Sequence, residues 1–521
     1  MMTPLLTAAE IRRADQVMIE QYGYPGILLM ETAGRKSAEF ILERYPDEEV
    51  YLILAGPGNN GGDGLVIARY LHGAGKNVRL WLSHPPERFR GDAEINWHAL
   101  QGAHIPFFVW AAGATPQLEA GRRVLLVDAL LGTGVQDAPR GAIAEMIAFA
   151  RELPAHFPRI AIDLPSGLNA DQGALFPGSE PIPADFTLTF QTGKICHWVT
   201  PAANFCGEIV VVDIGIWPQV IAELSGPRAV MDGALAQTGY IAAASDTHKG
   251  RQGHALFIGG SRRYAGAIAL SAHAALAAGA GLSTVVTVDA ARAAIYALGP
   301  EVMVRSFPGD ALGDAHIAEV VALVEQLRPT TVAIGPGLDR EAAGLLRALA
   351  PHLPDQALIL DADALNLLAE NPDLWARLPQ QPTLTPHPGE FRRLAGRALG
   401  DRFADAVAFA QSKNCHLILK GAGTITTNGA YTYVNASGNP GMATAGAGDV
   451  LTGILAALLA QPSPPDRPLA AALAVYVHGL AGDLCAATQG RAGTTASGIV
   501  SQVGRAFELL RTRTAPTGLR I

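Results

Sequence analysis

Short apolar segments recur along this chain, alternate with helical patterns, and end in a glycine-rich loop or an acidic residue. They lie at residues 50–55, 78–82, 124–127, 159–162 and 208–212, and again at 255–258, 283–288, 331–334, 358–360, 383–385 and 417–419. Continuous apolar runs of this length are typical of strands buried on both faces of a parallel sheet. The pattern therefore predicts an α/β fold with ligand sites beyond the carboxyl ends of the strands.

The alternation breaks once, between Ile216 and Asp232, where Trp217-Pro218 and Gly226-Pro227 interrupt it. The chain has 521 residues, which exceeds the size of one ordinary domain. We therefore expect two domains, one comprising residues 1–225 and the other residues 226–521.

Composition narrows the classes of partner. With 49% hydrophobic and 17% charged residues the chain is expected to be folded, and a net charge of −8 does not attract nucleic acid or an acidic membrane. Polar residues interrupt every long apolar run, so we expect no membrane span. The four cysteines lack close pairing, which indicates buried thiols and a cytoplasmic location. Small molecules are the expected partners.

The first motif, Gly56-Pro57-Gly58-Asn59-Asn60-Gly61-Gly62-Asp63-Gly64, follows a predicted strand and precedes a helix expected at residues 65–71. Its glycines permit positive φ and a close backbone approach, and the helix start favours an anion such as a pyrophosphate. The run matches neither the GxGxxG fingerprint nor a Walker loop. A tight turn is the alternative, but two Asn and an Asp favour a polar role.

Acids at strand ends form the second pattern. Asp128 ends one strand and precedes Gly132-Thr133-Gly134, and Asp163 ends another and precedes Ser166. Asn60, Asp128 and Ser166 offer only oxygen ligands, which suits a monovalent cation or a hard divalent one that keeps its waters. Asp163 is then free to act as an acid or base. Capping of the next helix is the alternative for any single Asp.

These runs, together with Thr189-Phe190 and Lys194, resemble the NAD(P)HX epimerase family over roughly residues 7–220. The substrate of that family is a reduced nicotinamide cofactor hydrated at C6. The resemblance implies a potassium ion held by Asn60, Asp128 and Ser166, and makes Asp163 the candidate catalytic acid/base. It implies substrate contacts from Asn59, Asn60, Gly61, Gly62, Asp63, Gly132, Thr133, Gly134, Val135, Gln136, Asp137, Ala138 and Asp163.

In the second half, Gly446-Ala447-Gly448-Asp449 opens an apolar helix expected at residues 450–460. Backbone N–H groups at a helix start lack intrahelical partners and lie at the positive end of the helix dipole, so they hold phosphate. Asp449 is a candidate base for a substrate hydroxyl. This combination suits phosphoryl transfer from a nucleotide to an alcohol.

Further loops follow strands in the same half. Lys420-Gly421-Ala422-Gly423-Thr424 is typical of a nucleotide loop, in which the backbone contacts phosphate and the Lys neutralises charge. Pro386-His387-Pro388 fixes a His on a loop, which favours ligand contact. Ala267 begins a helix of small residues that a flat ring can pack against, and Gly337 follows another strand.

These runs, in this order, resemble the NAD(P)HX dehydratase family of the ribokinase-like superfamily over roughly residues 232–510. The resemblance implies that Ala267, Gly337, His387 and Asp449 face the hydrated cofactor. It implies ADP as phosphoryl donor, with Mg²⁺, on a nucleotide site formed by Lys420, Gly421, Ala422, Gly423, Thr424 and Gly448. The fused arrangement resembles bacterial bifunctional NAD(P)HX repair enzymes.

The two resemblances together imply an N-terminal Rossmann-like three-layer α/β/α domain and a C-terminal ribokinase-like α/β domain. The implied function is epimerisation of R- and S-NAD(P)HX, and dehydration of the S form to NAD(P)H with release of phosphate and AMP. Ala- and Gly-rich helices permit tight subunit packing, and we expect a homo-oligomer.

Two alternatives remain open on the residues alone. One is a small-molecule kinase of the ribokinase-like group, acting for example on a hydroxymethylpyrimidine, with a regulatory first half. The other makes the first half a dinucleotide-sensing module without catalysis. The first-half motifs argue against both because they supply a full ligand site with all its strand-end acids.

Overall fold

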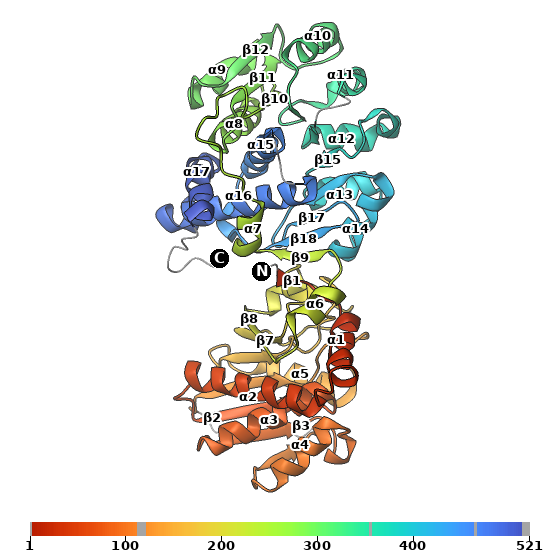
Figure 1. The fold of residues 1–521 in the computed structure, drawn as a ribbon, viewed down its shortest axis with the longest axis vertical. Helices are drawn as coiled ribbons and strands as arrows, with labels where there is room; N and C mark the ends of the chain where they lie inside the picture. Colours follow the sequence, from red (N-terminus) through yellow and green to blue (C-terminus); the bar gives the residue numbers. More distant parts are fainter. Residues whose placement is uncertain (1–2, 112–120, 354–356, 463–465, 513–521) are drawn as a thin grey trace. The chain divides into compact units, whose positions relative to one another are not determined.

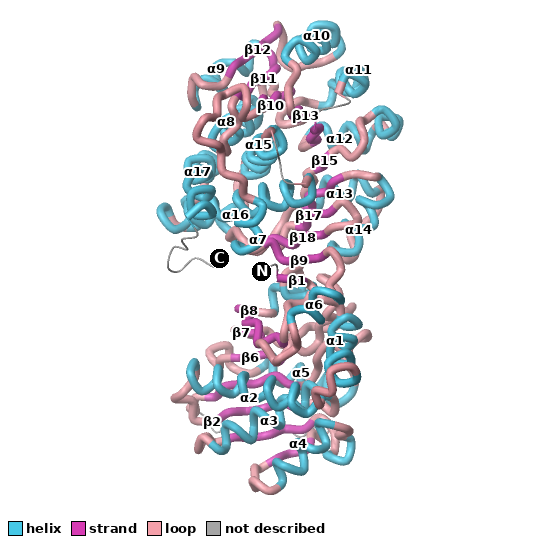
Figure 2. Tube along the Cα trace, viewed as in Figure 1, coloured by secondary structure: helices cyan, strands magenta, loops and turns pink. Residues whose placement is uncertain are grey.

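Two sheets, each covered by helices, organise the computed structural model, which describes residues 3–111, 121–353, 357–462 and 466–512 (Figures 1 and 2). The chain divides into two units. The first contains Pro4–Arg228 and Asp401–Phe403, and the second contains Ala229–Gly400 and the described residues from Ala404 onward, together with Thr3. We describe each unit by itself.

The first unit has a parallel sheet whose strand order reverses between β2 and β5. The chain leaves β2 toward one edge and leaves β5 toward the other, so right-handed crossovers put their helices on opposite faces. The Rossmann-like three-layer prediction is confirmed. In spatial order the strands are β4 (Phe107–Val109), β3 (Val78–Leu82), β2 (Val50–Ala55), β5 (Val124–Ala129), β6 (Arg159–Ile162), β7 (Phe186–Phe190) and β8 (Glu208–Val212).

Both faces of this sheet are buried. Tyr51 and Ile53 of β2 pack into a core shared with α1, α2, α3, α4 and α6, whereas Leu52 and Leu54 point the other way, into a core with α5. This alternation is the reason for the continuous apolar runs in the sequence. The helices are α1 (Ala8–Glu20), α2 (Gly26–Arg44), α3 (Asn59–Gly73), α4 (Asp92–Gln101), α5 (Gly141–Glu152) and α6 (Pro218–Leu224).

The glycine-rich run after β2 is helical, so the predicted start of its helix at residue 65 is wrong. Helix α3 begins at Asn59, and the glycines within it do not have positive φ. Their role is close packing. A Cβ on Gly61 would overlap the carbonyl oxygen of Gly56, and a Cβ on Gly62 would lie 2.7 Å from the sulfur of Met30.

In the second unit, the sheet is parallel from β12 to β16 and continues as antiparallel β17 and β18. Its strand order also reverses, between β13 and β10. In spatial order the strands are β1 (Thr3–Pro4), β9 (Arg228–Met231), β18 (Thr432–Asn435), β17 (Ile425–Thr427), β16 (His416–Leu419), β15 (Thr383–Leu384), β14 (Ala357–Leu360), β13 (Thr331–Ile334), β10 (His254–Ile258), β11 (Leu282–Val288) and β12 (Met303–Phe307).

The helices of this unit cover both faces of its sheet (Figure 1). α8 and α15–α17 share one large core with the strands. The helices are α7 (Gly233–Gly239), α8 (Ala265–Ala277), α9 (Asp289–Leu298), α10 (Ile317–Leu327), α11 (Ala343–Leu349), α12 (Asp363–Glu370), α13 (Pro388–Ala395), α14 (Arg402–Lys413), α15 (Ala447–Ala460), α16 (Arg467–Gln489) and α17 (Ala496–Thr512).

Among the described residues, α16 alone has the length and apolarity that a membrane-crossing helix needs. Of its most apolar window, 78% is buried inside the unit, and a core helix passes the same test. All four cysteines are free and buried, as predicted.

Close contact between α15 and α8 depends on Gly453. A Cβ at Gly453 would overlap the carbonyl oxygen of Ser271 and lie 2.7 Å from the Cβ of Ala274. Gly453→Ala should therefore destabilise the second unit by about 1–3 kcal/mol, the usual cost of overpacking a core. Calorimetry of the purified protein measures the shift.

The control is Gly266→Ala, on the exposed first turn of α8, where an added Cβ meets nothing within 4 Å. It should leave the melting temperature unchanged or raise it slightly, because Ala favours a helix over Gly. Equal melting temperatures for Gly453→Ala and the unsubstituted protein would contradict the packing argument.

Candidate functional sites

A cavity of about 500 Å³ lies in the first unit, where the strand order reverses. The loops after β2 and β5 and the first turn of α3 line it, together with α1 and α2. Ligands of open α/β sheets bind at this position. Of the residues predicted to contact substrate, those that line the cavity are Asn59, Asn60, Asp63, Gly132, Thr133, Gly134, Val135 and Asp163.

The other predicted contacts of this unit lie elsewhere. Gly61 and Gly62 are buried in α3, against Gly56 and Met30. Gln136, Asp137 and Ala138 belong to the continuation of the loop after β5, where Gln136 and Asp137 are exposed, and none of the three lines the cavity.

Asp163 is the most constrained acid of the cavity. It follows β6 directly, and its φ of +66° is rare outside glycine. Its carboxylate forms an ion pair with Lys194, whose side chain is completely buried. A buried ammonium is costly unless it is paired and hydrogen-bonded. Lys194 also donates to Thr189 Oγ1 (2.6 Å) and to the carbonyl of Phe190 (3.3 Å).

A neutral histidine lies next to this ion pair. His197 Nδ1 accepts a hydrogen bond from the backbone N–H of Lys194 (3.1 Å). Burial, followed by the positive charge of Lys194, lowers the pKa of His197 to about 3. The imidazole therefore adds no second positive charge to the cavity at neutral pH.

The sequence analysis did not assign Lys194 a role, and it missed Asp15 of α1. Asp15 lines the cavity and belongs to the same helical stripe as Ile11, Ala14 and Met18, at spacings of three, four and seven residues. An acid on the apolar stripe of an amphipathic helix was the available signal. Burial, followed by the charge of Asp163, raises the pKa of Asp15 to about 6, against the opposing effect of Lys194.

The three predicted cation ligands meet around one loop. Ser166 Oγ donates to Asp128 (2.6 Å) and accepts from the N–H of Leu131 (3.0 Å), while Asn60 Nδ2 donates to the carbonyl of Leu131 (2.9 Å). Asn60 Oδ1 is buried and has no hydrogen-bond partner. Burial raises the pKa of Asp128 to about 6, although hydrogen bonds from Ser166 lower it. An unpartnered amide oxygen beside a buried carboxylate fits a cation that prefers oxygen.

In the second unit, the structure brings Asp449 and Lys420 together with Asp361, which ends β14. Asp449 lies in the first turn of α15, which begins at Ala447 after Gly446 with φ of +86°, so this helix also starts before its predicted position. Lys420 Nζ donates to Asp361 Oδ1 (2.9 Å), and Thr452 Oγ1 donates to Asp361 Oδ2 (2.7 Å). A Cβ at Gly448 would lie 3.2 Å from Lys420 Nζ, which places the start of α15 beside the ammonium.

Burial and neighbouring charges together shift the pKa values of Asp449 and Asp361. Burial, followed by the negative charge of Asp361, raises the pKa of Asp449 to about 7, and Lys420 opposes the rise. Burial alone raises the pKa of Asp361, but Lys420 and the hydrogen bonds to Asp361 hold it below the usual value. Asp361 is therefore the charged partner of the lysine, and Asp449 is the acid that titrates near neutrality.

His387 caps helix α13. Its Nδ1 accepts hydrogen bonds from the N–H groups of Gly389 (2.9 Å) and Glu390 (3.3 Å). Burial, followed by Lys420, lowers its pKa. Glu390, which was not predicted as a site residue, accepts from the His387 N–H (2.8 Å) and lies 3.9 Å from Lys420 Nζ.

The other predicted residues of this unit are Ala267, Gly337 and those of the Lys420–Thr424 loop. Ser271, one helical turn after Ala267, donates to the carbonyl of Asp449 (2.9 Å). Gly337 has φ of +64°, and a Cβ there would overlap the carbonyl oxygen of Tyr264. The Lys420–Thr424 loop is closed by a hydrogen bond from Thr424 Oγ1 to Gly421 O (2.7 Å), with φ of +138° at Gly421 and +61° at Gly423. Ala422 lies between these two glycines.

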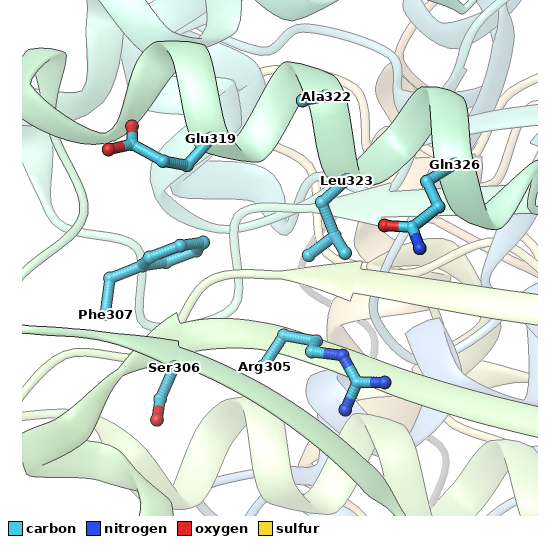
Figure 3. Close-up of a pocket in the computed structure, with 7 residues that line it drawn as sticks. All are labelled: Arg305, Ser306, Phe307, Glu319, Ala322, Leu323 and Gln326. Carbon is cyan, nitrogen blue, oxygen red and sulfur yellow. The ribbon is translucent and has the colours of Figure 1, made fainter.

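A separate small cavity of about 230 Å³ lies between the sheet edge at β12 and α10 (Figure 3). Arg305 and Phe307 project from the strand toward Leu323 of the helix. None of the predicted site residues lines this cavity.

Two mostly parallel α/β units, each with a carboxylate–lysine pair beyond its strand ends, define a two-domain enzyme. Each half of the chain matches the model of a known protein family. A model of the YjeF-related protein N-terminus matches residues 27–196, and a model of NAD(P)H-hydrate dehydratase matches residues 255–505.

Similar full-length proteins share both halves. A bifunctional NAD(P)H-hydrate repair enzyme of Moorella thermoacetica is 39% identical over 94% of this chain and 93% of its own length. Others come from Salinibacter ruber (35%, covering 96% of each chain) and Leishmania infantum (36%, covering 93% and 90%). The chain belongs to the family of bifunctional NAD(P)H-hydrate repair enzymes, with an epimerase and a dehydratase domain. This confirms the resemblance, although its restriction to bacteria is too narrow.

Solved structures resemble the second half of the chain. A ribokinase-like superfamily protein from Enterococcus faecalis is 28% identical, covers 55% of this chain and 96% of its own, and has a TM-score of 0.48. An ADP/ATP-dependent NAD(P)H-hydrate dehydratase from Bacillus subtilis, co-crystallised with ATP and Mg²⁺, is 24% identical, covers 54% and 98%, and has a TM-score of 0.45.

The raised pKa of Asp449 makes a prediction about stability. Folding raises the pKa of Asp449 from 3.8 to about 7. The contribution of Asp449 to the free energy of unfolding is therefore fully present below pH 4, and it is lost as the pH rises through 7. Asn cannot ionise. Asp449→Asn should therefore stabilise the second unit at pH 8 by about 1–3 kcal/mol, at about 1.4 kcal/mol per pKa unit less an allowance for solvent.

Calorimetry at pH 4 and pH 8 tests this, and the difference should vanish at pH 4. The control is Asp466→Asn, an exposed acid of the same unit, for which the melting temperature should change equally at both pH values. An Asp449→Asn protein that is less stable at pH 8 would contradict the buried-carboxylate argument.

Proposed function

We propose that Asp449 is the base that activates the C6 hydroxyl of S-NAD(P)HX for attack on the terminal phosphoryl group of ADP. The observation that carries the proposal is the position of Asp449, in the first turn of α15 and within the electrostatic reach of Lys420 and Asp361. A pKa of about 7 suits proton transfer at neutral pH because the group is then both available and basic.

The reaction follows from these groups. The hydroxyl proton passes to Asp449 as its oxygen attacks the phosphoryl group, and AMP leaves. The N–H groups of Gly448 and Asp449, in the first turn of α15, lack intrahelical acceptors and stabilise the developing negative charge, and the Ala447 N–H, which donates to the carbonyl of Thr444 (3.4 Å), would turn to the same charge. Phosphate then leaves C6 with its bonding electrons, C5 loses a proton, and the C5–C6 double bond of NAD(P)H is restored.

The nucleotide site of the proposal is the Lys420–Thr424 loop with Gly448. Its two positive-φ glycines hold the backbone in a shape that other residues rarely adopt, and Lys420 supplies positive charge. Mg²⁺ would enter with the nucleotide and would supply positive charge to its phosphates. Within the described ranges, no group of three or more His, Cys, Asp or Glu side chains can hold a metal, which fits an ion carried by the nucleotide.

In the first unit, we propose that Asp163 is an acid/base for interconversion of the R and S forms in the 500 Å³ cavity. Lys194 holds the Asp163 carboxylate in orientation through their buried ion pair. Asn60, Asp128 and Ser166 would hold K⁺, which would supply positive charge near the loop that carries Gly132. The unpartnered Asn60 Oδ1 supports this ligand set.

Small molecules remain the proposed partners: NADHX, NADPHX and ADP, with neither nucleic acid nor membrane. A homo-oligomer and a cytoplasmic location stay predictions from the sequence. We likewise propose that residues 1–225 carry the epimerase activity and that residues 226–521 carry the dehydratase activity.

Separate substitutions should separate the two activities. Asp449→Asn should lower nucleotide-driven dehydration of S-NADHX by about 10²–10⁴-fold, the usual contribution of a general base, and leave epimerisation intact. Asp163→Asn should do the reverse. Recovery of dihydronicotinamide absorbance with ADP and Mg²⁺ measures dehydration, and chromatography of the R and S forms measures epimerisation. Equal loss of both activities in either variant would refute the assignment of Asp449 to dehydration and Asp163 to epimerisation. A stable phosphorylated product would instead favour a small-molecule kinase.

Potassium should act on the first unit alone. Replacing KCl with tetramethylammonium chloride at constant ionic strength should slow epimerisation at least about tenfold, because the bound ion is itself a charge of the site. K⁺ should also raise the melting temperature of that unit by preferential binding to the folded state. Ser166→Ala should shift both effects to higher K⁺ concentration. Identical melting curves with and without K⁺ would rule out the ion.

A further inference from the structure

Three carboxyl groups that share the epimerase cavity with one fully buried ammonium carry the argument. Asp15 reaches it from α1, Asp63 from the first turns of α3, and Asp163 from the end of β6, while the ammonium is that of Lys194. Lys194 is already committed to an ion pair with Asp163. The remaining charged residues of the lining are Arg12, which is exposed, and Asp92, which is partly exposed.

Like charges this close cannot all ionise at once, so the cavity retains a proton. Burial, followed by the charges of Asp163 and Asp15, raises the pKa of Asp63 well above its usual value. Asp63 is buried to 8% exposure, and its raised pKa favours the protonated form. Asp15 differs, because it is only partly buried, exchanges its proton with solvent, and has a pKa of about 6.

Interconversion of R- and S-NAD(P)HX needs two proton-transfer groups. C6 carries a hydroxyl and is bonded to the ring nitrogen N1, so it is a hemiaminal carbon. Removal of the hydroxyl proton forms a C6 carbonyl, breaks the C6–N1 bond and sends its electron pair to N1, which takes up a proton. Rotation about C5–C6 and reversal of these steps give the other epimer. A base alone leaves the N1 anion without a proton.

We propose that Asp15 is the second catalytic residue of the epimerase, donating the proton to N1 while Asp163 accepts the hydroxyl proton. The two exchange roles when the ring closes, so the cycle needs no external acid or base. This inference rests on the proposed role of Asp163. Asp15 and Asp163 reach the same cavity from different elements, which lets substrate bind between a proton donor and a proton acceptor.

Asp15→Asn tests the proposal in the full-length protein. The rate of R/S interconversion should fall by about 10²-fold or more, the usual loss on removing a general acid. The unsubstituted enzyme needs Asp15 protonated, so its kcat/KM should decline above pH 6, and this alkaline limb should be absent in Asp15→Asn. Dehydration of S-NADHX by the same molecules, measured with ADP and Mg²⁺, should be unchanged, and calorimetry of the first unit reports that the unit carrying Asp15 is folded.

Two further variants separate proton transfer from packing and charge. Asp15→Glu keeps the acid and should retain the alkaline limb and more activity than Asp15→Asn. Glu20→Gln removes an exposed negative charge from the same helix, outside the cavity, and should leave the rate unchanged. If Asp15→Glu is no more active than Asp15→Asn, packing explains the loss and the proposal is overturned.

An unchanged rate and pH profile for Asp15→Asn also overturns it. Asp163→Asn, measured alongside, distinguishes this failure from that of the underlying function. If Asp163→Asn is inactive while Asp15→Asn is fully active, only the role of Asp15 is lost. If Asp163→Asn is fully active too, the proposed epimerase mechanism fails with it.

Discussion

Close approach of the loop backbones that follow neighbouring parallel strands is the constraint on which both sites depend. In the first unit a Cβ at Gly56 would overlap the carbonyl oxygen of Leu130, and in the second a Cβ at Gly335 would overlap that of Asp361. Any side chain at these positions would force apart the loops that follow neighbouring strands. The acids that end those strands would then separate as well, so the glycines set the spacing of the charged groups.

The two units reach a similar electrostatic arrangement with unrelated residues. Each buries one lysine beyond its strand ends and pairs it with one strand-end aspartate, Lys194 with Asp163 and Lys420 with Asp361. Each ammonium makes its shortest ion pair with that aspartate, and Glu390 lies farther from Lys420, at 3.9 Å. A further acid nearby therefore experiences burial and a negative neighbour together, and its pKa rises toward neutrality. Asp449 is that acid in the second unit, and Asp15 occupies the equivalent electrostatic position in the first.

The sequence predicted the strands that form continuous apolar runs, including the partly exposed β8, and missed β7, in which Thr alternates with apolar residues. β2, β3 and β13 have the predicted bounds, whereas β12 and the antiparallel pair β17–β18 were missed because polar residues interrupt them. α3 and α15 begin earlier than predicted. Their glycines suggested a loop, but in the structure these glycines lie within or next to the first turn of a helix. Strand-end acids such as Asp163 were visible in the sequence. Asp15 and Glu390 were not, because helical acids usually face solvent and only tertiary packing turns these two inward.

The backbone is strained at the strand ends that carry Asp163 and Asp361. Asp163 has φ of +66° and Ala362, directly after Asp361, has φ of +49°. Such a conformation costs a non-glycine residue about 1–3 kcal/mol. At Asp163, the N–H donates to the carbonyl of Leu188 in β7 (2.8 Å), and the carboxylate is held by Lys194. Glycine would relieve the strain at residue 163 but carries no carboxylate. Residue 163 thus combines a strained turn of the backbone with a carboxylate that Lys194 holds at the cavity.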